Sequence, residues 1–494
     1  VTFAGNKIED LDLDFDSSSL QAAGEDYGHL VSLEPFAVAN PSSVDELETI
    51  LKTARKNHVV VAAQGQSHSV MGQNMAANGI AINMTNFNQI YIDAQNMNVW
   101  VGAGATWREL LEATLQVGLT PKIFTDYIDL SIGGVISAGG IGAQSYRAGF
   151  QVDNVLALQV VNGKGKTYDC SPSSNSELFH AVVGGLGQFG VITKVNIPLE
   201  PAQPFARYVR TLYVDIDVFL ADMFFLLHDE RYEGVQGFVV ANDEQGLAIG
   251  TGNAFPNLNL PIGSSPFLYM IEATAYYTGA APDIADLQQG LNNIPGEEAI
   301  NILDLPYYVF IARLDPIEAA LRDSGLWYFP HPWIDVFVPR SEASSFIQNE
   351  LSLLGPTDVN GAILVYPYLT SVLNTPNFPV PDEDEIVTFG LLRTAIPPTP
   401  QRAAELVAAN EQIYTRTLAV GGTGYSIDAV PLNPEAWEVH FGATRYAELL
   451  STKKKHDPEN ILAPTQHVFY NHAIQSTMHL LLINSTESVN KQSF

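Results

Sequence analysis

Apolar residues in the first part of the chain recur at helical spacing and at strand spacing by turns, which predicts an α+β or α/β unit. Ser43 and Glu46 form a capping box, and a helix is predicted over residues 44 to 56. Its apolar positions are Leu47, Ile50, Leu51 and Ala54. Thr106 and Glu109 form a second capping box before a helix that ends at Gly118. Strands are predicted at residues 59 to 63, 80 to 84, 90 to 92, 98 to 101, 155 to 161 and 191 to 197.

Changes in composition divide the chain into four segments. Residues 1–30 are acidic, serine-rich and aperiodic, which predicts a loosely held arm. Residues 31–203 form the first predicted domain, because Pro201 and Pro204 mark a boundary. Residues 204–420 are rich in Tyr and Phe and form a second domain, and residues 421–494 are expected to return to the first.

Composition narrows the possible functions. At 494 residues the chain is too long for one ordinary hydrophobic core. Its formal net charge of −30 repels phosphate backbones, so nucleic acid is not an expected partner. The basic run at 453–455 follows Ser451-Thr452 and is interpreted as a solvated helix end. The sequence contains no run of about 18 apolar residues, so no membrane span is predicted. Cys170 is the only cysteine, which excludes an internal disulfide and a cysteine-based metal site, and no metal is expected.

The segment Gly65-Gln66-Ser67-His68-Ser69 carries the first candidate chemistry. It follows an apolar run, and a strand that ends in a turn of small residues can hold one imidazole at a fixed point. His68 is therefore a candidate for cofactor attachment, with a solvated loop histidine as the alternative. Glycine-rich segments at 133–142 and 184–190 allow backbone to approach a ligand closely, or form tight turns at crowded junctions.

Several ordered motifs together resemble the flavin-dependent oxidoreductases of the vanillyl-alcohol-oxidase type, and specifically the cytokinin dehydrogenases. The resemblance covers roughly residues 35 to 470. Its motifs are Gly65 to Ser69 with Gly72-Gln73, Phe124-Thr125-Asp126-Tyr127 with Ile132-Gly133-Gly134, residues 184–193, residues 330–340, Leu364-Val365-Tyr366-Pro367, and His440-Phe441-Gly442 with residues 457–466. The resemblance implies a two-domain α+β flavoprotein, with an FAD-binding domain of the PCMH type and an inserted cap domain built on an antiparallel sheet.

The resemblance implies that His68 carries FAD through a covalent bond from its imidazole to the flavin 8α carbon. Cys170 lies outside the flavin-facing segment, so attachment is expected through His68 alone. The other positions that look like FAD contacts are Gly65, Gln66, Ser67, Ser69, Gln73, Asp126, Ser131, Gly133, Gly134, Ser137, Ile141, Ile192, Tyr425 and Gln466.

Asp126 is the expected catalytic residue. Oxidation of a secondary amine requires loss of an N–H proton as hydride leaves the adjacent carbon, and a carboxylate placed on that N–H orients the amine and accepts the proton. An N-cap or turn aspartate is the alternative for an isolated Thr-Asp-Tyr. Trp333 is expected to flank a flat substrate, with core packing as its alternative.

The chain departs from the family pattern at several of these positions. Gln66 and Ser67 stand where the flavin turn usually has Arg and Gly, and Ser67 requires more of the backbone than glycine. Gln236 stands where plant enzymes place a glutamate that meets the purine at the cavity mouth, and Asp335 replaces a common asparagine. Gln236, Trp333 and Asp335 are the candidate substrate contacts.

The leading hypothesis is a covalent flavoprotein that oxidises an N6-substituted adenine of the cytokinin type to an imine, which hydrolyses to adenine and an aldehyde. A related oxidase of an alcohol or sugar, or a flavin-containing protein that binds ligand without turnover, are the alternatives. Oxygen or a quinone is the expected electron acceptor, and the protein is expected to be a monomer that does not bind membranes. The chain begins at Val1, so a missing N-terminal segment is expected, and the compartment stays open between secreted and cytoplasmic.

Overall fold

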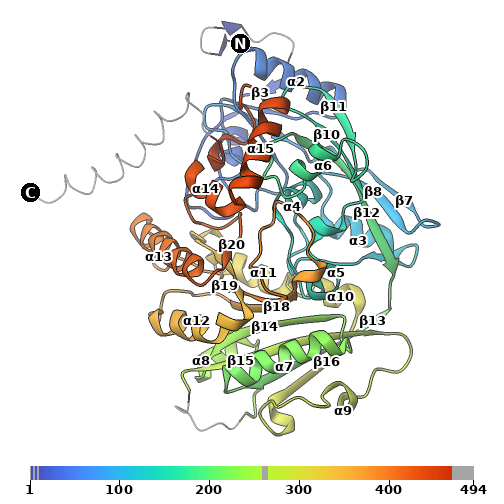
Figure 1. The fold of residues 1–494 in the computed structure, drawn as a ribbon, viewed down its shortest axis with the longest axis vertical. Helices are drawn as coiled ribbons and strands as arrows, with labels where there is room; N and C mark the ends of the chain where they lie inside the picture. Colours follow the sequence, from blue (N-terminus) through green and yellow to red (C-terminus); the bar gives the residue numbers. More distant parts are fainter. Residues whose placement is uncertain (1, 4–5, 8–10, 259–264, 470–494) are drawn as a thin grey trace, which may run out of the picture.

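The computed structural model describes residues 2–3, 6–7, 11–258 and 265–469, and shows two parts stacked along the long axis (Figure 1). The upper part contains a four-stranded and a six-stranded sheet, and the lower part contains one eight-stranded sheet. A short ribbon of β1 (Thr2–Phe3) and β2 (Asn6–Lys7) lies at the N-terminus. Both parts combine helices with sheets, and every pairing in the eight-stranded sheet is antiparallel. The predicted α+β class is confirmed.

The four-stranded sheet packs against the first predicted helix, α2 (Val44–Lys56). Its strand order is β3 (Leu13–Asp14), β4 (Ala37–Ala39), β6 (Ile80–Asn83) and β5 (Val61–Gln64), with β4 and β5 parallel to β6. Ser43 accepts a hydrogen bond from the backbone N–H of Glu46, but the Glu46 carboxylate accepts from the N–H of Ser42. The predicted capping box is therefore only half formed.

The six-stranded sheet forms the rest of the upper part. Its strands are β7 (Ile90–Asp93), β8 (Asn98–Gly102), β9 (Leu119–Pro121), β10 (Ala157–Val161), β11 (Thr167–Cys170) and β12 (Val191–Pro201). The helices around it are α3 (Trp107–Leu115), α4 (Ile132–Ala138), α5 (Ser145–Ala148) and α6 (Ser176–Val182). Thr106 and Glu109 complete the predicted capping box of α3, which ends at Leu115, before the predicted Gly118.

The eight-stranded sheet is covered by helices on one face. Its strand order is β16 (Ile300–Pro306), β13 (Phe205–Tyr213), β15 (Phe267–Tyr277), β14 (Gly234–Ala241), β18 (Ile363–Leu369), β19 (Glu385–Leu391), β17 (Ile334–Pro339) and β20 (Thr423–Gly424). The covering helices are α7 (Ile216–Asp229), α12 (Arg340–Leu353) and α13 (Pro400–Ala419). Shorter helices are α8 (Glu244–Gly250), α9 (Ile284–Leu287), α10 (Tyr307–Ile311) and α11 (Asp315–Asp323).

The opposite face of this sheet looks towards the upper part. Side chains alternate between the two faces of a strand, so Val365 packs under the helices while Tyr366 joins the core shared with the upper part. The same alternation places Gln236 and Glu272 on the face of Tyr366, because their neighbours Val235 and Ile271 pack under the helices. This face of the sheet thus presents polar and aromatic side chains towards the upper part.

Residues 434–469 pack on the upper part, although they follow the lower part in the sequence (Figure 1). Here lie α14 (Pro434–Phe441) and α15 (Ala443–His456), and Leu462 forms a parallel bridge with Val61 of β5. Strand β20 lies beyond residue 420 but pairs with β17, so the large sheet includes a strand from the predicted C-terminal segment. The rest of that segment, after residue 469, lies outside the described residues.

Two expectations from the sequence are wrong in detail. Within the predicted loose arm, residues 17–23 form α1 (Ser17–Ala23), and Asp26 and Tyr27 are buried, because they pack against the turn after β5. In the basic run, Lys453 is buried and forms an ion pair with Asp457, so this helix end is not fully solvated. Among the described residues, no helix has both the length and the apolar character needed to cross a membrane.

Candidate active site

The predicted flavin turn follows β5 and lies close to Ser131. A Cβ on Gly65 would lie 2.0 Å from Ser131 Oγ, so only glycine permits this approach. Ser67 has a φ of +50°, which for a residue with a side chain costs about 1 to 2 kcal/mol. The departure from glycine at this position therefore places a strained residue directly before His68.

The turn is held by residues 26–28 of the predicted arm. The Asp26 carboxylate accepts hydrogen bonds from Ser69 Oγ at 2.7 Å and from the N–H of Gly72 at 2.6 Å. The N–H of Tyr27 donates to the Ser67 carbonyl at 2.9 Å, and the N–H of Gly28 donates to the Ser69 carbonyl at 3.0 Å. These bonds fix the backbone on both sides of His68.

Aromatic rings hold the half-buried imidazole of His68 from two sides. Tyr27 stacks on it with ring centroids 4.1 Å apart, and Tyr127 lies at 4.8 Å. Tyr27 also stacks on His331 of the lower part at 4.4 Å. Burial, with smaller contributions from His331 and Arg322, lowers the pKa of His68 to about 3. The imidazole is therefore neutral near pH 7, the form with a free nitrogen lone pair.

The other predicted FAD contacts are joined by hydrogen bonds between distant loops. Tyr425 Oη accepts from the N–H of Gly140 at 3.0 Å, and the Ser137 carbonyl accepts from the N–H of Leu186 at 2.8 Å. Gln466 Nε2 donates to the carbonyls of Leu186 at 2.8 Å and Gln73 at 3.1 Å. The structure thus brings the loops around residues 73, 137, 186, 425 and 466 together.

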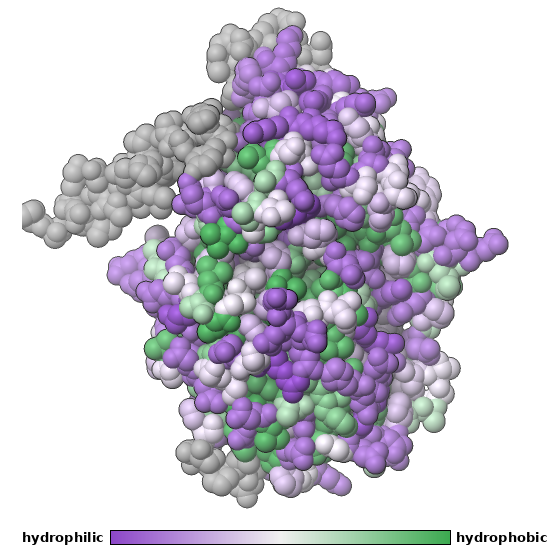
Figure 2. Space-filling model, in the orientation of Figure 1, coloured by the Kyte–Doolittle hydropathy of each residue, from purple (hydrophilic) through white to green (hydrophobic). Residues whose placement is uncertain are grey.

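These residues fit a bound FAD. The buried Oε1 of Gln466 has no hydrogen-bond donor among the described residues, which leaves an acceptor for a ligand N–H. Ser137, Ile141 and Tyr425 are only partly buried, although they lie between the two parts. On the face drawn in Figure 2, hydrophobic residues form several patches that hydrophilic residues separate. Ile192, on β12, is 5% exposed and packs in the core, so it is less accessible to a ligand than Ser137, Ile141 and Tyr425.

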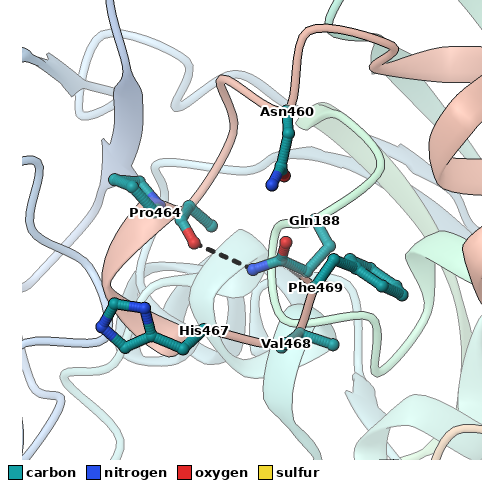
Figure 3. A pocket seen from close by; sticks show the side chains of 7 residues that line it. Gln188, Asn460, Pro464, His467, Val468 and Phe469 are labelled. Carbon is teal, nitrogen blue, oxygen red and sulfur yellow. Dashed lines mark hydrogen bonds between the residues drawn. The ribbon is translucent and has the colours of Figure 1, made fainter. Parts of the chain in front are cut away.

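A small cavity is lined by the loop after α15 and by one residue before β12, namely Asn460, Ala463, Pro464, residues 467–469 and Gln188 (Figure 3). Its volume is about 10 Å³, and Gln188 Nε2 donates to the Ala463 carbonyl at 2.9 Å on its wall. This space suits one water molecule, so it belongs to the support of the loop and not to a substrate site.

Asp126 lies between the two parts and contacts groups from the lower one. Its Oδ1 forms an ion pair with Arg313, which lies between α10 and α11, and its Oδ2 accepts from Tyr366 Oη at 2.6 Å. Arg313 also lies over the Phe310 ring, with its guanidinium carbon 4.7 Å from the centroid. Both oxygens of Asp126 are therefore positioned by the lower part, one by Tyr366 of the eight-stranded sheet and the other by Arg313 between α10 and α11.

Gln236 does not lie at an open mouth, as the comparison with plant enzymes suggested. It is 2% exposed, and its Nε2 donates to Glu272 Oε2 at 2.8 Å, because the two residues are register partners on β14 and β15. Burial raises the pKa of Glu272, while the positive charge of Arg313 opposes this shift. Arg313 thus forms an ion pair with Asp126 and also acts electrostatically on Glu272 of the eight-stranded sheet.

Trp333 directly precedes β17, and Asp335 is the second residue of that strand. The Trp333 ring meets Tyr27 edge-on at 5.0 Å and lies 6.2 Å from His68. Asp335 accepts at its backbone carbonyl from the N–H of Tyr425 at 3.0 Å. Both predicted substrate contacts therefore lie next to predicted FAD contacts.

The sequence missed several residues that complete this site. No sequence pattern pointed to Tyr27 or Arg313. Tyr366 and His331 belong to motifs of the family resemblance, but neither was predicted as a site residue. Cys170 is buried on the outer strand β11, and burial raises its pKa to about 12, which keeps the thiol neutral.

Comparisons with known proteins give one consistent result. Residues 203–469 match the family model described as "Cytokinin dehydrogenase 1, FAD and cytokinin binding", and residues 35–171 match the model "FAD binding domain". Cytokinin dehydrogenase 9 of Oryza sativa subsp. japonica is 34% identical, over 94% of this chain and 92% of that protein. Cytokinin dehydrogenase 5 of Arabidopsis thaliana is also 34% identical, over 92% of this chain and 88% of that protein.

A bacterial protein and a solved structure extend the comparison. The uncharacterized oxidoreductase ORF5 in the fasciation locus of Rhodococcoides fascians is 33% identical, over 91% of this chain and 97% of that protein. The crystal structure of the VAO-type flavoprotein MtVAO615 from Myceliophthora thermophila C1 has a TM-score of 0.68, at 17% identity, over 88% of this chain and 80% of that chain. This last similarity shows a shared VAO-type fold.

Proposed function

Because the chain belongs to the cytokinin dehydrogenase family, an FAD-dependent group, we propose that it oxidises the secondary amine of an N6-substituted adenine with covalently bound FAD. The observation that carries the proposal is the position of Asp126, a carboxylate between the two parts that Arg313 and Tyr366 hold by its two oxygens. The product is an imine, which hydrolyses to adenine and an aldehyde. Oxygen or a quinone then takes the electrons.

His68 is the proposed attachment point for FAD. Its neutral, stacked imidazole has a lone pair for bonding to carbon, and residues 26–28 hold its turn rigidly. When bound, FAD supplies the hydride acceptor at flavin N5. The buried Oε1 of Gln466 and the close approach of Gly65 to Ser131 support binding along the neighbouring loops.

Asp126 is the proposed proton acceptor. Its oxygens keep free lone pairs beside the bonds to Arg313 and Tyr366, so an amine N–H can donate to the carboxylate and transfer its proton there. Since both partners come from the lower part, the carboxylate is aimed before substrate arrives, and no reorientation is needed in the transition state.

The substrate ring is proposed to lie against Trp333, beside Asp335. Trp333 offers a flat apolar surface of the kind that purines stack on, and it is held by its edge-on contact with Tyr27. Gln236 is proposed to act through Glu272, because its amide is bonded to that carboxyl inside the sheet.

Anaerobic mixing of the purified flavoprotein with isopentenyladenine tests this function. Bleaching of the visible flavin absorption, with formation of adenine, is expected. Sugars and aryl alcohols form the comparison panel, and bleaching by one of these alone would assign the protein to the alternative oxidase class. A spectral shift without bleaching would make it a binding protein without turnover. The covalent bond is tested separately: after denaturation the yellow colour should stay with the wild-type chain and leave His68→Ala.

A further inference from the structure

Two carboxyl groups, Asp428, which is buried, and Asp335, which is partly exposed, lie together beside the predicted flavin contacts. Asp428, just after β20, accepts a hydrogen bond from the N–H of Asp335 at 3.0 Å. Asp428 is 6% exposed, and its Oδ2 has no hydrogen-bond partner among the described residues. A Cβ on Gly390 would lie 2.1 Å from Asp335 Oδ1, so this glycine leaves the space that the carboxyl fills.

Within the part of the chain that the structure describes, no cation balances this pair. The groups that face it are Tyr368 of β18, Tyr425 and Tyr414, and in residues 11–258 and 265–469 no lysine, arginine or histidine contributes to the titration of either carboxyl. Burial raises the pKa of Asp335 to about 7 and that of Asp428 well above its usual value. Two neighbouring buried carboxylates without a counter-ion do not both ionise at neutral pH.

The two carboxyls differ in what they can reach. Asp335 is partly exposed and lies on the same face of β17 as Phe337, which packs against Tyr425, whereas the flanking Ile334 and Val336 pack under the helices. Tyr425 in turn contacts Gly140 of the predicted FAD loop. Asp335 is therefore the member of the pair that lies on the sheet face towards the upper part and the predicted FAD loop.

We propose that Asp335 and Asp428 form a proton-holding pair, and that Asp335, as a neutral carboxylic acid, donates a hydrogen bond to an acceptor atom of the ligand bound between the two parts. The acceptor is a ring nitrogen, which both the flavin and an N6-substituted adenine carry, or a carbonyl oxygen, which the flavin carries. The ligand part of this inference rests on the proposed function, while the proton-holding part does not. An ionised Asp335 has no proton to donate, so the hydrogen bond is lost as the pH rises.

Thermal unfolding tests the proton-holding pair without any turnover. In the unfolded chain an aspartate ionises near pH 3.9, so the buried acid loses stability relative to it as the pH rises towards 7. Asp335→Asn keeps the shape and cannot ionise, so its melting temperature relative to wild type should rise between pH 5 and pH 8. Asp428→Asn should show the same trend. Asp222→Asn is the matched control, a buried carboxylate that accepts two hydrogen bonds from Asn292. An equal difference at both pH values for Asp335→Asn and Asp428→Asn would overturn the pair.

The ligand is identified by a pH series on the substrate-free holoprotein and on turnover. If the acceptor belongs to the flavin, the visible spectrum of wild type shifts between pH 6 and pH 8, and that of Asp335→Asn does not. If it belongs to the substrate, the spectrum stays constant and the wild-type KM rises about threefold to tenfold, the value of one hydrogen bond, while Asp335→Asn stays flat. No difference between the proteins in either measurement would overturn the donor role, even where the melting data support the pair.

Discussion

The phenol ring of Tyr27 stacks on the imidazole of His68, with centroids 4.1 Å and planes 17° apart. Aromatic pairs contribute about 0.5 to 1.5 kcal/mol beyond their buried area, so this contact helps to fix the ring that is proposed to carry FAD. Tyr27→Leu should slow formation of acid-stable flavin by about twofold to tenfold when the apoprotein is incubated with FAD. Tyr27→Phe keeps the stacked ring and is the control. Attachment at the wild-type rate in Tyr27→Leu would show that the stack has no part in it.

The ion pair between Arg313 and Asp126 leads to a second prediction. Asp126→Asn should keep its bound flavin, but the substrate should reduce that flavin about 100-fold more slowly than in wild type. This is the usual scale for the loss of a general base. Arg313→Gln should slow reduction by about tenfold to 100-fold, because a charge-assisted hydrogen bond that aims the carboxylate is lost. Stopped-flow reduction with isopentenyladenine measures both rates.

Arg402→Gln is the matched control for this prediction. Arg402 belongs to α13, which covers the helix-bearing face of the eight-stranded sheet, and it pairs with Asp358 and Glu405. It should leave the reduction rate near that of wild type, and Arg313→Lys should recover part of the lost rate. Rapid reduction in Arg313→Gln would remove the positioning role of Arg313.

The elements that the sequence predicted well have signals within a few residues. Helix α2 has the predicted bounds, and β6 and β8 lie within one residue of the predicted strands, because apolar spacing and caps are local properties. The turn at residues 65–69 could be located for the same reason, since a strand followed by small residues is visible in the sequence.

The contacts that complete the site could not be predicted in this way. Arg313 and Tyr366 lie 187 and 240 residues from Asp126 in the chain, and no period or cap encodes such a meeting. Tyr27 lies in an aperiodic segment whose burial depends on the turn it covers. Gln236 was expected at a cavity mouth, but its exposure is set by its cross-strand partner Glu272, which the sequence alone does not identify.

Gln236 also makes a third prediction possible, through the substitution that restores the plant residue. Gln236→Glu would place a second carboxyl against Glu272, whose pKa burial already raises. A carboxyl with a raised pKa loses stability relative to the unfolded chain as the pH rises above about 4.3, and a second one in contact strengthens the effect. The melting temperature of Gln236→Glu should therefore fall further below wild type at pH 8 than at pH 5. Gln236→Met removes the hydrogen bond to Glu272 without adding a second carboxyl, so its difference from wild type should depend on pH less than that of Gln236→Glu.

The buried ion pair of Lys453 and Asp457 leads to the fourth prediction. Lys453 Nζ lies 2.9 Å from Asp457 Oδ2 and donates to the Gln188 carbonyl at 2.8 Å, with side chains 3% and 0% exposed. Lys453→Met should destabilise the protein by about 3 to 5 kcal/mol, because it leaves the Asp457 charge buried without its partner. Lys454→Met removes an exposed charge on the same helix and should change stability by less than about 0.5 kcal/mol.

The double variant Lys453→Met, Asp457→Leu separates the cost of an unpaired charge from that of lost packing. Removing both charges should recover part of the stability lost in Lys453→Met, since an apolar pair of similar volume needs no counter-ion. Asp457 also accepts hydrogen bonds from the N–H groups of Ile461 and Leu462, so recovery should be incomplete. Thermal unfolding of the holoprotein measures all four proteins. A double variant less stable than Lys453→Met would mean that these backbone bonds, and not the ion pair, are the main contribution of Asp457.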